Sequence, residues 1–351
     1  MSVPYAREMP PLRTKAASVK EAGELSLIRQ IRSRASAISG ARLTLGIGDD
    51  CALLRPRAGE ELAVTTDLSI AGRHFRLDWH APESVGHRAL ARGLSDLAAM
   101  GARPVAAFLS LGLPRELIVA AGRKPAWVQG FLNGLLALAE AHQTPLAGGD
   151  LAESPLALAD IVLTGAVPRG RELLRSGARP GDLLYVTGAL GGAAAGLAKL
   201  AELAGDEEAG PPRIPKKLED LLAPHLYPQP RIAQGLWLQR NRRASAALDL
   251  SDGLSTDLAH LCEESGVGAE VDAGALPVSS GATLDQALHG GEDYELLFTA
   301  PAGKRMPRAI AGVPVTAIGR IVAARRNRPL VTLVIAKGSE PLTPQGWEHF
   351  R

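Results

Sequence analysis

Aspartates gather at the ends of apolar segments in this sequence. Asp49 and Asp50 directly follow the run LTLGIG, Asp67 and Asp150 follow ELAVTT and TPLAGG, and Asp249 and Asp252 fall in ALDLSD. Strand ends are where α/β proteins place their chemistry. Adjacent carboxylates repel each other unless cations or hydrogen-bond donors neutralise them, and the neighbouring glycines leave room for such a partner. The pattern therefore points to a site that binds cations.

The residue types around these aspartates favour Mg²⁺ as the cation. Carboxylates and the hydroxyls of Thr65 and Thr66 are hard oxygen ligands, which suit this ion. Magnesium keeps several waters and usually bridges to substrate phosphates. Several Mg²⁺ ions that hold a polyphosphate would account for the paired charges. Asp96, which falls on a predicted helix off its apolar stripe, could join the group from an adjoining element.

A structural interpretation of each single aspartate stays open. Asp is common in turns and at helix N-caps, so Asp252 with Gly253 could be a cap alone. Asp96 lies four residues after Arg92 and eight after Arg88, which is also the spacing of a solvated row of charges on a helix. The clustering, rather than any one residue, favours function.

The common phosphate-binding motifs are absent from the sequence. There is no G-x-x-x-x-G-K-[ST] and no H-R-D with a downstream D-F-G, so neither a P-loop nor the protein-kinase pattern is indicated. GIGDDC lacks the third glycine of G-x-G-x-x-G, and GALGGAAAG has the wrong spacing for it. An unusual nucleotide fold is the remaining interpretation.

Composition limits the class of protein. With 351 residues, 46% of them hydrophobic, the chain is long enough for two domains. The 39 Lys plus Arg against 37 Asp plus Glu give a net charge of +2, which does not favour a nucleic-acid partner. The two cysteines, Cys51 and Cys262, form no CxxC, and we expect them to be small core hydrophobes in a reducing cytoplasm. No apolar segment approaches the roughly 20 residues that span a bilayer, so no membrane association is expected.

The order of segments predicts two α/β units with a hinge near residues 166–180. In the first, we expect helices over 25–35, 83–100 and 126–143 and strands over 43–48, 61–70, 104–114, 144–150 and 159–168. In the second, we expect strands over 183–188, 289–300 and 330–336, a helix over 191–205, and a strand, a turn and a helix in that order over 244–266. Six prolines and clustered charges over 205–230 predict a surface excursion. Residues 1–24 show no apolar region of a secretory signal and predict a flexible tail; a transit peptide is the alternative.

Several motifs together resemble one enzyme family. They are GIGDDCALL, TTDLSIAGRHF, LSDLAAMGARP, AGGD, RSGARPGDLLYVTG, LDLSDGLSTDL, GGEDYELLF and a terminal GWEHF. On these residues, the region 25–351 is similar to the thiamine-monophosphate kinase family of the aminoimidazole-ribonucleotide synthetase superfamily. The cysteine segments typical of two relatives, selenophosphate synthetase and a hydrogenase-maturation factor, are missing.

The resemblance implies a fold and an activity. The fold class is α/β of the α+β type, with an N-terminal mixed-sheet domain over 25–168 that binds ATP and Mg²⁺ and mediates dimerisation, and a C-terminal α/β domain over 169–351. The activity is ATP-dependent phosphorylation of thiamine monophosphate to thiamine diphosphate, in a cleft between the domains of a homodimer. Two alternatives stay open: another ATP-dependent synthetase of the superfamily with a different small substrate, and a non-catalytic nucleotide-binding module.

The resemblance also implies roles for single residues. The Mg²⁺ ligands would be Asp50, Thr65, Thr66, Asp67, Asp96, Asp150, Asp249 and Asp252, with Asp49 ranked below them. ATP contacts would come from Gly149, Asp150, Arg175 and Ser251, and thiamine contacts from His74, Glu292 and Trp347. The catalytic residues would be Asp67, Asp150 and Arg175. The chain departs from the family pattern at Gly93, where Asn is usual, and in LAES after GGD, where a Thr-rich turn is common.

Overall fold

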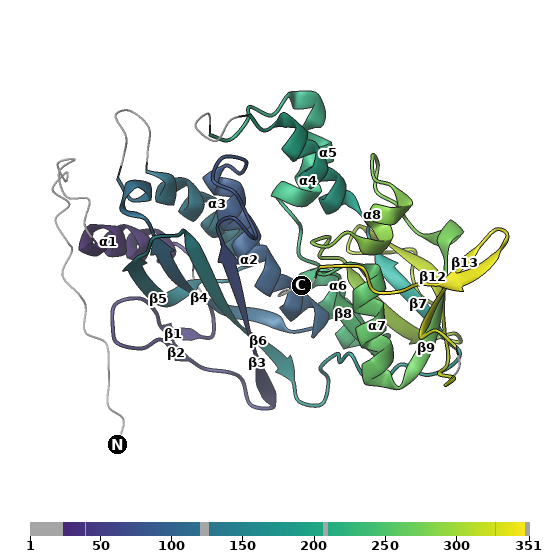
Figure 1. The fold of residues 1–351 in the computed structure, drawn as a ribbon. Coiled ribbons are helices and arrows are strands. Elements are labelled where there is room, and N and C mark those ends of the chain that lie inside the picture. Colours follow the sequence, from purple (N-terminus) through teal and green to yellow (C-terminus); the bar gives the residue numbers. More distant parts are fainter. Residues whose placement is uncertain (1–23, 39, 120–125, 206–209, 327, 348–351) are drawn as a thin grey trace, which may run out of the picture.

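The computed structural model describes residues 24–38, 40–119, 126–205, 210–326 and 328–347, and Figure 1 shows them as two α/β units side by side. The predicted tail therefore lies outside the described residues, except for Glu24, which begins helix α1. The N-terminal unit comprises α1 (Glu24–Ala35), β1 (Leu43–Leu45), β2 (Leu53–Leu54), β3 (Glu60–Ile70), α2 (Pro82–Ala99), β4 (Arg103–Leu113), α3 (Trp127–Ala141), β5 (Leu146–Glu153) and β6 (Leu158–Pro168).

The N-terminal sheet has the order β3-β6-β4-β5, in which only β4 and β5 run parallel. One face packs beneath α2 and α3, where Ile161 and Leu163 are fully buried. The β1–β2 hairpin covers part of the opposite face through Leu43 and Leu54. We call this opposite face the outer face of the sheet.

Helix α2 is central to the arrangement, because it packs on the N-terminal sheet and also contacts α5, α6 and β8 of the other unit (Figure 1). Leu90, Leu94 and Leu97 form its fully buried apolar stripe, as the sequence spacing predicts. Helices α2 and α3 approach so closely that a Cβ on Gly86 would lie 1.9 Å from the Phe131 carbonyl oxygen. Only glycine allows this backbone contact.

The C-terminal unit is built on an eight-stranded sheet of order β14-β13-β9-β12-β7-β10-β8, with β11 paired to β12. Only β13 and β9 pair in parallel. The elements are β7 (Asp182–Thr187), α4 (Gly192–Leu203), α5 (Glu219–Leu226), α6 (Ile232–Asn241), β8 (Ala246–Asp249), α7 (Leu254–Ser265), β9 (Val267–Asp272), α8 (Leu284–His289), β10 (Leu296–Pro301), β11 (Ala309–Ile310), β12 (Val313–Ala323), β13 (Val331–Ile335) and β14 (Gly338–Pro341).

The expected hinge interval lies between the two sheets, since β6 ends at Pro168 and β7 begins at Asp182. The domain boundaries 25–168 and 169–351 stay a prediction. No helix of the described ranges is both long and apolar enough to cross a membrane.

Three expectations about local structure are wrong. Residues 219–226 form α5, whose Leu222 and Leu226 are buried against α4, so the described part of 205–230 is not only a surface excursion. Cys51 is exposed because it lies in the loop after β1, whereas Cys262 is buried as expected. In the predicted strand over 289–300 the strand begins only at Leu296, because Glu292 and Tyr294 have positive φ angles of 66° and 50°.

Candidate active site

A cavity of about 540 Å³ lies between the two units, and we call it the inter-domain cavity. Residues from β3, α2 and the loop after β3 line one side, and residues from α4, α5 and the loops after β8 and before β10 line the other. The structure brings eight of the predicted site residues to this cavity, namely Asp67, His74, Asp96, Asp249, Ser251, Asp252, Glu292 and Trp347. The prediction that both units contribute to one cleft is therefore met in the geometry.

Three aspartates of the cavity are largely buried and electrostatically coupled. Burial raises the pKa of Asp67 to about 6; Arg92 opposes this rise and Asp96 adds to it. Burial, with the nearby charges of Asp96 and Asp67, raises the pKa of Asp249 to about 7. Burial also raises the pKa of Asp96. These carboxylates favour the arrival of positive charge, because a cation would stabilise their ionised form.

Hydroxyl and backbone donors hold these acids in place. The Thr65 hydroxyl donates to Asp96, and the Ser95 hydroxyl donates to Asp249 Oδ2 at 2.7 Å. Asp257 of α7 holds the loop after β8, because its carboxylate accepts hydrogen bonds from the backbone N–H groups of Asp252 and Gly253 at 3.0 Å each. Asp252 is therefore not the side-chain cap of α7, and the cap interpretation of this residue is wrong.

Glu292 lines the cavity and is held by an arginine with two histidines nearby. Arg88 Nη2 contacts both Glu292 carboxylate oxygens, at 2.6 and 2.7 Å. His225 Nδ1 lies 3.5 Å from Glu292, and His225 Nε2 lies 3.0 Å from His80 Nε2. Burial, with the Arg88 charge, lowers the pKa of both histidines, in His80 to about 4. At neutral pH both histidines are therefore uncharged, and Arg88 is the group that neutralises Glu292.

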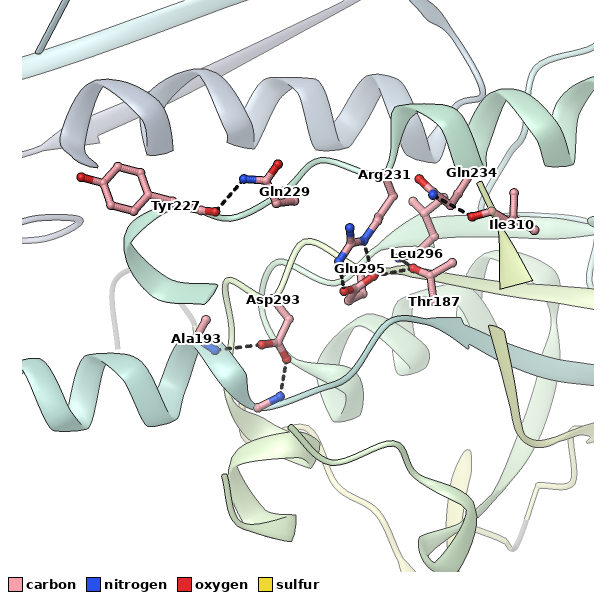
Figure 2. Close-up of polar contacts among 11 residues, drawn as sticks. Thr187, Ala193, Tyr227, Gln229, Arg231, Gln234, Asp293, Glu295, Leu296 and Ile310 are labelled. Atoms are coloured by element: carbon pink, nitrogen blue, oxygen red, sulfur yellow. Dashed lines mark hydrogen bonds and ion pairs between the residues drawn. The ribbon is translucent and has the colours of Figure 1, made fainter. Parts of the chain in front are cut away.

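Asp293 and Glu295 alternate with Glu292 and Tyr294 along the chain, do not line the cavity, and anchor the segment through hydrogen bonds (Figure 2). Asp293 accepts the backbone N–H groups of Gly191 and Ala193, at 2.6 and 3.1 Å, at the start of α4. Glu295 pairs with Arg231 at 2.5 and 2.6 Å and accepts the Thr187 hydroxyl at 2.6 Å. Left-handed backbone at a non-glycine residue costs free energy and persists only where its surroundings impose it. These anchors impose it at Glu292.

Trp347 reaches the cavity from the C-terminal segment. Its backbone N–H donates to the Asp252 carbonyl at 3.2 Å, and its side chain is 51% exposed. The preceding Gly346 has no room for a side chain, since a Cβ would lie 1.9 Å from the same carbonyl oxygen. The rest of the GWEHF motif lies outside the described residues. His74 is positioned by its own loop, because its Nδ1 accepts the Ile70 N–H at 3.1 Å.

The remaining predicted residues lie elsewhere. Asp50, Gly149 and Asp150 line a second cavity of about 440 Å³ at the β5 edge of the N-terminal sheet, which we call the edge cavity. Thr66 alternates with Thr65 and Asp67 along β3, so it lies on the outer face and does not line the inter-domain cavity. Asp150 pairs in register with Ser110, which also lies on the outer face.

Arg175 is an exposed residue that lines neither cavity. Its positive charge is nonetheless close enough to lower the pKa of Asp96, although burial outweighs this influence. The predicted metal and ATP residues are therefore divided among the inter-domain cavity, the edge cavity and this exposed loop.

Comparisons with known proteins agree with this architecture. Residues 48–170 match AIR synthase related protein, N-terminal domain, and residues 179–331 match AIR synthase related protein, C-terminal domain. The thiamine-monophosphate kinase of Escherichia coli strain K12 is 40% identical over 342 residues, which cover 93% of this chain and 98% of that relative. This chain belongs to the thiamine-monophosphate kinase family.

Solved structures of thiamine-monophosphate kinases support the same assignment. The enzyme of Stenotrophomonas maltophilia K279a is 39% identical with a TM-score of 0.73, over 88% of this chain and 96% of that one. A structure described as AaThiL complexed with AMPPCP and TMP is 31% identical with a TM-score of 0.71, over 96% of this chain and all of that one. The predicted family and the predicted two-domain fold with mixed sheets are confirmed.

The oxygen atoms that line the inter-domain cavity are of the type that binds Mg²⁺. The inter-domain cavity offers carboxylate and hydroxyl oxygens, and its acids have raised pKa values that a cation would relieve. Within the described ranges, no three acidic, histidine or cysteine side chains lie close enough to form a complete metal cage.

The sequence did not point to several residues that line or support the cavity, among them Trp79, His80, Arg88, Arg92 and His225. The i, i+4, i+8 spacing of Arg88, Arg92 and Asp96 was the available signal. The solvated-row interpretation of that spacing is wrong, because Arg88 is only 6% exposed and Arg92 lines the cavity.

Proposed function

We propose that this chain transfers the γ-phosphoryl group of ATP to the phosphate of thiamine monophosphate, which yields thiamine diphosphate and ADP. The observation that supports it best is the inter-domain cavity, where acids suited to cations and residues suited to a cationic aromatic ligand share one space. Family membership and a relative described as binding AMPPCP and TMP support the same substrates.

The proposed reaction needs no general base. A phosphate monoester has a second pKa of about 6, so the attacking phosphate oxygen is largely unprotonated at neutral pH. This oxygen attacks the γ-phosphorus, the bond from that phosphorus to the bridging oxygen breaks, and ADP leaves with the electron pair. The main obstacle is repulsion between two anions, which the protein reduces by alignment and positive charge.

We propose that Mg²⁺ is held by Thr65, Asp67, Asp96, Asp249 and Asp252 in the inter-domain cavity and by Asp50, Thr66 and Asp150 on the outer side. Bound Mg²⁺ would neutralise phosphate oxygens of both substrates. Ser251, Gly149 and Arg175 are the proposed ATP contacts, and Arg175 would add positive charge beside the acids. His74, Glu292 and Trp347 would orient the thiamine moiety, whose thiazolium charge suits a carboxylate and an aromatic face.

We also propose a homodimer formed through the outer face of the N-terminal sheet. Val64, Leu62 and Leu68 of β3 alternate on this face, and they are 62%, 42% and 45% exposed. Such a row of exposed apolar side chains is typical of a protein interface. Light scattering on the purified chain tests this, with twice the monomer mass as the expected result.

We also propose that the protein works in a reducing cytoplasm, in which its two cysteines, Cys51 and Cys262, stay free thiols.

The test of the activity follows both products at once. Purified protein is incubated with ATP, Mg²⁺ and thiamine monophosphate, with EDTA as a control and thiamine as an alternative acceptor. Equimolar ADP and thiamine diphosphate that disappear with EDTA are the expected result. The second candidate, a synthetase of the superfamily, is favoured if ATP turns over with an aminoimidazole precursor but thiamine diphosphate never forms.

A further inference from the structure

Arg92 lines the inter-domain cavity from helix α2. On α2, Arg88 lies one turn before it and pairs with Glu292, whereas Asp96 lies one turn after it. Eight helical residues rise by about 12 Å. Arg92 itself contacts Asp67 at 3.3 Å. It therefore stands between the residues proposed for the thiamine moiety and those proposed for the cations.

Arg92 carries its charge without help from its neighbours, because an arginine guanidinium stays protonated in proteins. The side chain is only 18% exposed. Arg92 is thus a permanent cation that the fold places inside the cavity.

The contact between Arg92 and Asp67 is loose compared with the other arginine pairs of the site. Arg88 contacts Glu292 at 2.6 Å, and Arg231 contacts Glu295 at 2.5 Å, while Arg92 Nη2 lies 3.3 Å from Asp67 Oδ1. A guanidinium has five N–H donors in a planar fork, and its strong pairs with oxyanions are short and often bidentate. Arg92 therefore keeps binding capacity for an anion that enters the cavity.

We propose that Arg92 binds the phosphate group of the phosphorylated substrate and releases Asp67 when it does so. The inference rests on the proposed function, because it assigns the position of the acceptor phosphate. A substrate with a cationic ring system at Glu292 must direct its phosphate toward the aspartates, which would repel it. Arg92 is the cation between these two ends, and its departure from Asp67 leaves that carboxylate able to accept another cation.

The test compares thiamine monophosphate with thiamine, which lacks only the phosphate. Isothermal titration without ATP, in EDTA, measures both ligands on the wild type, Arg92→Met and Arg115→Met. Arg115 is the matched control, because it is an exposed arginine that lines neither cavity. We expect Arg92→Met to weaken the binding of thiamine monophosphate by roughly 10- to 100-fold, as for a lost charged hydrogen bond. The affinity for thiamine should change by less than about 2-fold.

The affinity of the control variant for either ligand should fall by less than about 3-fold. A loss of affinity in Arg92→Met that is equal for the two ligands, or a phosphate-specific loss of the same size in Arg115→Met, would overturn the assignment. Arg92→Lys serves as the second variant, because it keeps the charge without the fork and should give an intermediate loss. Thermal unfolding of every variant confirms that the proteins compared are folded.

A second readout follows Asp67. Titration with Mn²⁺ alone, followed by electron paramagnetic resonance, should show tighter ion binding in Arg92→Met than in the wild type, since no guanidinium competes for the carboxylate. Unchanged or weaker Mn²⁺ binding contradicts the release of Asp67. Failure of the wild type to form thiamine diphosphate would instead overturn the proposed function, whereas an active wild type with an unchanged ligand preference in Arg92→Met overturns only this inference.

Discussion

Two groups of aspartates in this chain differ in their contact with solvent. Asp67, Asp96 and Asp249 are largely withdrawn into the inter-domain cavity, and their pKa values are raised. Asp50 and Asp150 are exposed around the edge cavity. Burial of a carboxylate disfavours its charged form, so the first group is maintained at a cost in stability, whereas the second is not. The buried group is arranged before any ligand arrives, and we expect the exposed group to be organised by the ligand.

The largest expected effect comes from the buried group. Asp67→Asn should lower turnover by roughly 10³-fold, because it removes a charge that the fold already holds at the reaction centre. The thermal midpoint at pH 8 should not fall, since the variant no longer buries an ionised carboxylate. Asp160→Asn is the matched control, since Asp160 influences the pKa of Asp67 but lines neither cavity, and it should change turnover by less than about 3-fold. Near-normal activity of Asp67→Asn would remove this residue from the site.

The exposed group should respond differently. Asp50→Asn should lower turnover at low Mg²⁺ by about 10-fold, and higher Mg²⁺ should restore most of the loss by mass action. Turnover measured across a Mg²⁺ series for Asp50→Asn and Asp67→Asn separates the two groups. If the Asp50 defect persists at saturating Mg²⁺, the difference between buried and exposed aspartates does not extend to function.

Substitution of Trp347, which lines the inter-domain cavity, should have a smaller effect on activity. Trp347→Ala should raise the KM for thiamine monophosphate by about 5-fold, because one aromatic face for a cationic ring is lost. The KM for ATP should stay within about 2-fold. Initial rates with each substrate varied in turn provide the measurement. An unchanged KM for thiamine monophosphate would make Trp347 a structural residue.

The smallest effect concerns an acid that stabilises the fold. Hydrogen bonding to Arg42, with the charges of Arg42 and Arg103, lowers the pKa of Glu60 to about 2, despite partial burial. A lowered pKa contributes stability above the unfolded value of 4.5, and this contribution is lost as pH falls toward 2. Glu60→Gln should therefore reduce the free energy of unfolding at pH 7 by about 1 kcal/mol.

Denaturant unfolding of the wild type and Glu60→Gln between pH 7 and pH 3 is the measurement for this ion pair. The difference between the two proteins should narrow as the pH falls below 4.5. A difference that stays constant over this range would show that the Glu60 charge is not the cause. The contrast with Asp67 is direct, because that acid has a raised pKa and its substitution should not destabilise.

Much of the fold follows from local pattern. The apolar stripe of Leu90, Leu94 and Leu97 predicted α2, and Gly101 ends it with a φ of 62° as expected of a C′ residue. The conformation of the segment before β10 could not be predicted in the same way. The left-handed backbone at Glu292 depends on residues that lie far away in the chain, such as Arg231 and Gly191. Local propensity contains no information on such anchors.

The candidate site shows the same division. Aspartates after apolar runs were sufficient to select the candidate acids, and motifs such as TTD and GGED carried the resemblance to the family, because both depend on residue type and spacing; Mg²⁺ stays a prediction. Only the tertiary structure decided which of them share a space: Asp67 lies beneath α2, Thr66 lies on the outer face, and Asp50 lies at the edge cavity. It also showed that Arg88 is buried and that Arg92 lines the inter-domain cavity, although the sequence pattern suggested surface charges. The physical reason is that burial and electrostatic neighbours arise from packing between distant segments, and no pattern within one helix or strand specifies them.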